Sequence, residues 1–221
     1  MKKIKKFKIH FTPYYIKQFV KKNYHKESLH IALPENIEEI INNKIAELKK
    51  LLLPAVVYDT FPYEKIKELL PYEAHLVNNN KSKSSKLFPN KVSLFAINID
   101  SESKLISEAT TTTNAASLEA IVTKAIINDG INKSINFVRR LLEEEIGKEP
   151  FMLDTMHIIL EKEKIGAISS LLDTAKINIT EPLLAQQQEC IVIGYTYWLS
   201  RKKYITITLA HSAATASSDK K

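Results

Sequence analysis

Glycine is scarce in this chain, with only four residues among 221. They are Gly130, Gly147, Gly166 and Gly194, so the closest two are 17 positions apart. Phosphate-cradling loops and dinucleotide-binding motifs need glycines a few residues from one another. The nucleophile elbow of hydrolases needs glycines on both sides of a serine. The spacing therefore excludes all three motifs.

Cysteine is scarcer still, because Cys190 is the only one. A single cysteine excludes an internal disulfide and any multi-cysteine zinc or iron-sulfur site. It also makes a reducing, cytoplasmic setting the default expectation. Cys190 precedes the apolar run Ile191–Ile193, which favours a small buried side chain over a reactive nucleophile.

Long apolar runs are missing, since no window approaches the ~18 residues needed to cross a bilayer. Residues 1–26 instead contain nine lysines and no acid, which accounts for the net charge of +7. Lys8 and His10 interrupt the apolar residues that follow the first lysines, so the pattern is not that of a secretory signal. We interpret the lysines as a solvated face. Nucleic acid is the less favoured partner, because no arginine or aromatic platform stands out there. We expect no membrane contact.

The composition is that of a globular protein, with 44% hydrophobic and 26% charged residues. We expect one domain over residues 1–211. Residues 78–90 and 212–221 have too few apolar side chains to offset the entropy lost on ordering. We therefore predict a mobile loop at 78–90 and a disordered tail at 212–221.

Strands and helices are predicted to mix without a regular βαβ repeat, and the last three predicted strands are consecutive, which indicates an α+β fold with a mainly antiparallel sheet. Alternating or β-branched runs predict strands at 4–11, 55–61, 92–99, 176–180, 190–198 and 204–209. Apolar spacing and helix-start residues predict helices at 13–22, 34–51, 62–70, 102–111, 115–146 and 161–173. Gly130 lies inside the longest helix, at a point where it can bend or divide. The expected core includes Phe95, Ile97, Ile121, Val122, Ile193 and Trp198.

Candidate chemistry is sparse. No two of the six histidines have the i, i+4 spacing of a helical zinc motif, so no metal site is predicted. His157 lies between Met156 and Ile158, as expected for a core or strand-edge histidine. The hydroxyl run Thr110–Asn114 favours a turn or cap between helices over an anion site. The residues alone do not identify a reaction, and they leave the question of an enzyme open.

Several strings, taken in order, resemble the reactivation-domain family of cobalamin-dependent methionine synthase. Pro54–Tyr58 is similar to the family's proline-led strand, and Val92–Ile106 to its next strand and short helix. Ala115–Ile146 resembles its long central helix. Leu171–Glu181 and Ile191–Gly194 resemble its closing helix, strand and final strand. The resemblance covers about four-fifths of the chain and rests on the shared order of these strings.

The resemblance implies a single C-shaped α+β domain around a twisted, mainly antiparallel sheet. Such domains present S-adenosylmethionine to cob(II)alamin on a partner module, and the protein supplies position and electrostatics. The implied role is accessory to a corrinoid-dependent methyltransferase. The implied partner is a corrinoid-binding protein or a methionine synthase module, which would carry the cobalamin. Resemblance and position together indicate Asn136 and Asp154 as the candidate cofactor-binding residues.

The chain also departs from the family's pattern where S-adenosylmethionine is held. Residues 147–163 contain neither the family's Gly-Tyr motif nor an arginine. Where the family often has an acidic residue in its long helix, this chain has Asn136. These departures predict weak or no binding of S-adenosylmethionine. The alternative function is a non-catalytic scaffold or binding protein that contacts an acidic partner with its lysine-rich amino end.

Overall fold

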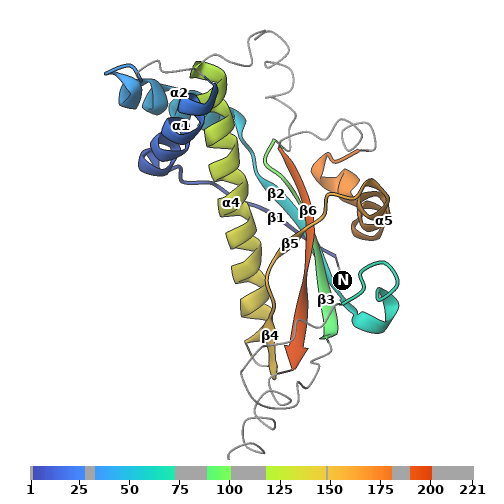
Figure 1. Cartoon of the computed structure of the whole chain (residues 1–221). Coiled ribbons are helices and arrows are strands. Elements are labelled where there is room, and N and C mark those ends of the chain that lie inside the picture. The colour runs from blue at the N-terminus through green and yellow to red at the C-terminus, as the bar shows by residue number, and fades with distance from the viewer. Residues whose placement is uncertain are drawn as a thin grey trace, which may run out of the picture.

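The computed structural model describes residues 2–27, 33–72, 89–100, 118–147, 149–180 and 190–200 (Figure 1). Its helices are α1 (Pro13–Glu27), α2 (Ile37–Leu51), α4 (Leu118–Ile146) and α5 (Lys162–Leu172), with 3-10 helices η1 (Tyr63–Lys65) and η2 (Thr174–Ile177). Its strands are β1 (Lys3–Lys6), β2 (Ala55–Pro62), β3 (Pro89–Asn98), β4 (Phe151–Leu153), β5 (His157–Ile158) and β6 (Ile191–Ser200).

The strands form one antiparallel sheet in the order β1, β2, β3, β6, β4, and β5 also pairs with β6. Tyr58 of β2 lies opposite Phe95 of β3, which in turn lies opposite Gly194 of β6. The predicted α+β class with an antiparallel sheet is confirmed.

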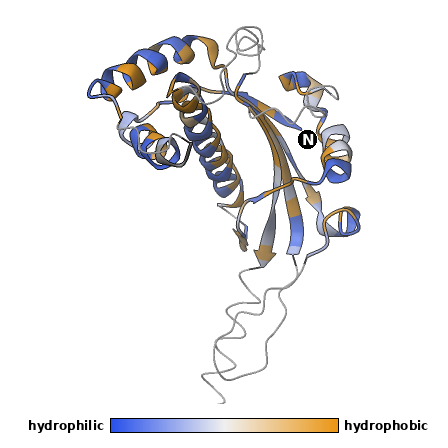
Figure 2. Cartoon of the chain, turned by 45° about the horizontal axis from the view of Figure 1, so that its top comes forward, coloured by the Kyte–Doolittle hydropathy of each residue, from blue (hydrophilic) through white to orange (hydrophobic). Residues whose placement is uncertain are grey.

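Helices cover both faces of the sheet, as Figures 1 and 2 show. One apolar cluster joins α1, α2 and α4 to the face that carries Val56, Phe95 and Ile97. A second cluster joins α5 and η2 to the opposite face. Successive strand residues alternate between the two clusters, which explains why β3 reads as a continuous apolar run: both of its faces are buried.

The predicted core is confirmed. Phe95, Ile97 and Val122 have no exposed surface, and Ile121, Ile193 and Trp198 are 3–4% exposed. Phe95 and Ile97 share the face that packs on the long helix. Cys190 is also buried, as expected for a small apolar side chain.

The strand predicted at 176–180 is wrong. Residues 174–177 form η2 instead, and Asp173 and Asn178 on either side of it have positive φ angles of 58° and 56°. Ile177 and Ile179 are both buried in the second cluster, which is why their spacing imitates a strand. The Asn98 side chain holds this turn, since its amide donates to the Ile177 carbonyl at 3.0 Å.

Other boundaries also differ from the prediction. The first strand ends at Lys6 rather than at residue 11, because its partner β2 begins only at Ala55, opposite Lys6. The helix predicted at 62–70 is replaced by the end of β2 at Pro62 and the short η1. The long helix runs unbroken through Gly130, where an added Cβ would lie 3.5 Å from the Ile9 and Phe11 side chains, an ordinary packing distance.

Several predictions fall on residues outside the described ranges. They are the helix at 102–111, the run 110–114, the strand at 204–209, the tail 212–221 and most of the loop 78–90. The last two residues of that loop, Pro89 and Asn90, belong to β3. Among the described helices, none is long and apolar enough to cross a membrane.

Candidate functional site

The two predicted cofactor-binding residues lie on different elements. Asn136 is exposed on α4, and Asp154 is partly buried in the link between β4 and β5. Among the described residues, no hydrogen bond joins the two side chains. The structure therefore provides a site around Asp154, while Asn136 stands apart on the helix surface.

The backbone of Asp154 is fixed against β6. Its N–H donates to the Tyr197 carbonyl at 2.9 Å, and its carbonyl accepts from the Thr196 hydroxyl at 3.1 Å. One carboxylate oxygen, Oδ1, accepts from the Thr155 N–H at 2.8 Å. Local side-chain to backbone bonds of this kind hold a turn, so the carboxylate is anchored at a defined place beside β6.

Aromatic side chains surround this turn on the α5 side of the sheet. The His157 ring stacks on Tyr195 with centroids 4.9 Å apart and planes 16° from parallel. Tyr197 meets Tyr195 edge-on at 5.2 Å and Tyr72 edge-on at 4.8 Å. The alternation Tyr195, Tyr197 puts both rings on one face of β6. We call His157, Tyr72, Tyr195 and Tyr197 the aromatic cluster.

Tyr197 is the buried centre of the cluster. It is 2% exposed, and its hydroxyl donates to the Leu70 and Pro71 carbonyls at 3.2 and 3.3 Å. Burial raises the pKa of Tyr197, and the neighbouring Tyr195 raises it further. Tyr197 therefore stays a neutral hydrogen-bond donor, whose role is to fasten residues 70–71 to the sheet.

Tyr72 and Asp154 are electrostatic neighbours. Burial raises the pKa of Tyr72, and the negative charge of Asp154 raises it further. The partly exposed surface of the site thus offers a neutral phenol, an anchored carboxylate and a stacked imidazole-phenol pair. These groups can hold a planar, hydrogen-bonding ring. They include no nucleophile paired with a base.

Gly194 lets β5 lie close against β6. A Cβ at this position would come closer than 3.0 Å to the His157 carbonyl oxygen and to the Phe95 ring. Only glycine avoids this contact. The sequence shows Gly194 as one of its few glycines, yet only the structure shows that it positions His157.

The cation beside the aromatic cluster already has a partner. Lys164 lies close enough to interact electrostatically with Tyr195, and it binds Glu161 at 2.7 Å. A ligand carboxylate would have to compete with this acid. Lys91 lies on the opposite, α4-facing side of the sheet, where it binds Glu149 at 2.7 Å and lies 5.0 Å from the Trp198 ring centroid. Within the described residues, no group of three or more histidine, cysteine or acidic side chains could hold a metal ion.

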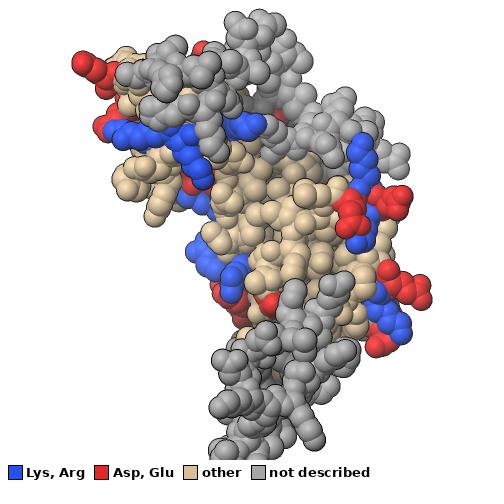
Figure 3. All heavy atoms as spheres, in the orientation of Figure 1, with Lys and Arg blue, Asp and Glu red and all other residues tan. Residues whose placement is uncertain are grey.

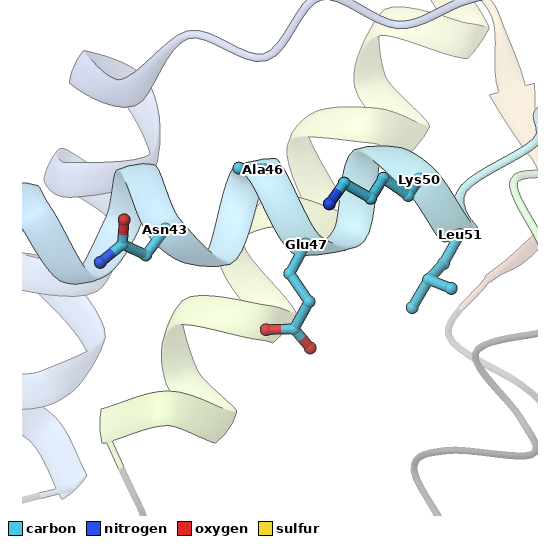
Figure 4. A pocket seen from close by; sticks show the side chains of 5 residues that line it. All are labelled: Asn43, Ala46, Glu47, Lys50 and Leu51. Atoms are coloured by element: carbon cyan, nitrogen blue, oxygen red, sulfur yellow. The ribbon is translucent and has the colours of Figure 1, made fainter.

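Two hollows lie away from Asp154. One, of about 370 Å³, is lined by α2 alone, and Figure 4 shows its side chains, Asn43, Ala46, Glu47, Lys50 and Leu51. Glu47 there is paired with Lys44 at 2.9 Å. The other, of about 500 Å³, lies between α1 and α2. Neither hollow was predicted, because no local sequence pattern marks it.

Comparison with known proteins gives a distant likeness. No protein-family model matches the chain, and no curated protein matches it. Among solved structures, the chain is similar to a crystal structure of the MetH reactivation domain bound to AdoHcy. The TM-score is 0.44 at 13% identity, and the match covers 88% of this chain and 78% of that chain.

Proposed function

We propose that this chain is an accessory protein of a corrinoid-dependent methyltransferase system, which docks on a corrinoid-carrying module and has a degenerate adenosyl pocket. The observation that carries the proposal is the order of elements. Where the sequence resembles the reactivation-domain family, the chain forms β2, β3, α4, α5 and β6 in that order. One string departs, because the strand expected after α5 is η2.

The described surroundings of Asp154 do not fit S-adenosylmethionine well. Its amino-acid tail needs a charge-assisted partner for the carboxylate, and Lys164, the cation beside the aromatic cluster, is bound to Glu161. The segment is also filled, since Leu153 and Met156 pack on the larger apolar cluster. In this proposal Asp154 keeps a polar position that faces the cofactor, without the rest of its pocket, and Asn136 offers a separate polar group on the surface of α4.

The expected weakening follows from the missing contacts. A hydrogen bond to a charged group contributes about 1.5–3 kcal/mol, so two lost contacts weaken binding by ~10²-fold or more. Isothermal titration with S-adenosylmethionine should give a dissociation constant in the millimolar range. A low-micromolar constant would restore a full reactivation mechanism.

Docking is tested separately with a purified cobalamin-binding module of methionine synthase, loaded with cob(II)alamin. We expect a saturable complex by biolayer interferometry, weakened by Asp154→Asn. Asp173→Asn is the matched control, because Asp173 borders η2 and also has a local partner, Lys176 at 2.9 Å. Failure of the native chain to bind the module in any cobalamin state would refute the accessory role.

A further inference from the structure

The hollow between α1 and α2 has the size of a small-ligand site, about 500 Å³. Its walls are mostly polar or aromatic, and Ile41 is the fully buried apolar residue among them. The lining residues are Pro13, Tyr14, Lys17, Gln18 and Lys21 of α1 and Glu38, Ile41 and Asn42 of α2. The hollow is independent of Asp154 and of the proposed accessory role.

Two tyrosines stand exposed at the start of α1. Tyr14 is 64% exposed and Tyr15 is 62% exposed, with their rings edge-on at 5.7 Å. The helix docks instead through Ile16 and Val20, which are buried one turn apart. Folding therefore does not require the two rings, which leaves them available to a partner.

Positive charge lies beside the rings. Lys17 donates a hydrogen bond to the Glu38 carboxylate. This hydrogen bond, together with the positive charges of Lys17 and Lys21, lowers the pKa of Glu38. Lys21 is exposed, and among the described residues no carboxylate lies within ion-pair distance of it. Figure 3 shows lysine side chains gathered over α1. Two lysines against one acid leave this hollow with an uncompensated cation.

Spacing along α1 puts ring, amide and cation on one side. Gln18 and Lys21 follow Tyr14 by four and seven positions, so the three share a helix face. Asn42 of α2 lines the same hollow. An exposed ring next to an amide and a cation is the combination that stacks a base, reads its edge and binds its phosphate.

We propose that the α1–α2 hollow and the two tyrosines bind single-stranded nucleic acid, with one base on Tyr14, its edge at Gln18 and Asn42, and the adjoining phosphate at Lys21. Tyr15 offers a second ring to the next base. This surface became visible only in the structure, because the sequence does not show that Tyr14 and Tyr15 face outward.

The groups present favour a nucleic-acid strand over an acidic peptide. Glu38 would repel a carboxylate placed in the hollow, whereas a base is neutral and can donate an N–H to it, as uracil does with its ring N–H. They also favour a polymer over a free nucleotide. Lys22 of α1 is a further exposed lysine next to Lys21, and residues 1–26 contain no acid, so a long polyanion gains contacts that one phosphate cannot.

The test is fluorescence anisotropy with a labelled oligouridylate of about 12 nucleotides, near the site size of such surfaces. The full chain should bind it, with affinity that falls as salt rises. Tyr14→Ala should weaken binding about tenfold, the loss of one stacked base. Tyr14→Phe, which keeps the ring, should restore most of the affinity.

Two lysine variants distinguish a direct contact between Lys21 and the oligonucleotide from a general effect of positive charge. Lys21→Gln should weaken binding and lower the salt slope by about one. Lys50→Gln removes the same charge from the far end of α2, where it lines the other hollow, and should have a smaller effect. Circular dichroism checks that each variant folds, as expected for exposed side chains.

Three results would overturn the proposal. They are no binding of the oligomer at low salt, equal binding by Tyr14→Ala and the native chain, and equal competition by a polyglutamate peptide of matched charge. The last would assign the surface to an acidic protein. Competition by uridine monophosphate at the oligomer's own concentration would overturn the polymer assignment.

Discussion

Adding one methyl group at position 194 is the sharpest test of how the sheet is packed. Gly194 lies in the middle of β6, opposite Phe95 on one side and next to β5 on the other. In Gly194→Ala the new Cβ would meet the His157 carbonyl oxygen and the Phe95 ring, both closer than 3.0 Å. We expect the native state to be strongly destabilised.

The size of the destabilisation depends on whether the groups around the new Cβ can move away. The His157 carbonyl belongs to a segment fixed by the Ile159 N–H bond to the Ile193 carbonyl at 2.9 Å, and Phe95 has no exposed surface into which its ring could turn. Overpacking a rigid core costs about 1–3 kcal/mol. With two fixed obstacles we expect about 3 kcal/mol, which lowers the melting temperature of a chain this size by about 6–12 °C.

Trp198 provides the assay, because it is the only tryptophan, 3% exposed, and lies on the same strand. Its fluorescence during urea unfolding reports the free energy of unfolding directly. Gly166→Ala is the control. A Cβ there meets no heavy atom within 4 Å and lies in α5, so that change should stabilise by about 0.5–1 kcal/mol.

A loss below about 1 kcal/mol in Gly194→Ala would refute the close approach of β5 to β6. The double variant Gly194→Ala, Phe95→Leu adds a further check. A smaller side chain at 95 should relieve part of the clash, so the double variant should lose less stability than the two single losses added together.

Three further changes test other parts of the fold. Phe95→Ala should lower the free energy of unfolding by about 3–5 kcal/mol, as a large-to-small core change does. A loss under about 1 kcal/mol would mean that the Phe95 side chain does not lie on the buried face of β3. Asn98→Ala removes the amide that donates to the Ile177 carbonyl and the oxygen that accepts from the Asp100 N–H, and should cost about 2–3 kcal/mol; unchanged urea unfolding would show that η2 is held by other contacts. Burial, and then the Glu145 hydrogen bond and charge, raise the pKa of Tyr58. Its neutral phenol therefore stabilises the fold fully below pH ~10, where an unfolded tyrosine ionises, and this contribution is lost as the pH rises above that value. Tyr58→Phe should reduce the drop in unfolding free energy between about pH 9 and pH 11, and an equal drop in both proteins would contradict the assignment.

The sequence alone was sufficient to predict those elements whose own apolar pattern requires burial. Phe95 and Ile97 lie in an apolar run too short for a helix, and Ile121 and Val122 follow helical spacing. Burial of such side chains is the largest favourable contribution to folding. The pattern therefore predicted β3, α4 and the core residues correctly, and with them the α+β class.

The candidate site was accessible to sequence reasoning only in part. Asp154 and Asn136 came from a resemblance and from position, and their role stays a prediction. His157 was expected in the core or at a strand edge, and it lies partly buried on the short strand β5. Its stacking on Tyr195 and the proximity of Tyr72 to Asp154 join residues more than 35 positions apart, which no local pattern encodes.

Only the tertiary structure determined those features that depend on packing against another element. Ile177 and Ile179 alternate like a strand, yet the Asn98 amide and two positive φ angles turn that segment into η2. The exposure of Tyr14 was decided in the same way, because α1 docks through Ile16 and Val20 and leaves the ring outside. Periodicity tells which residues share a face, but only the packing partner determines which face is buried and which meets solvent.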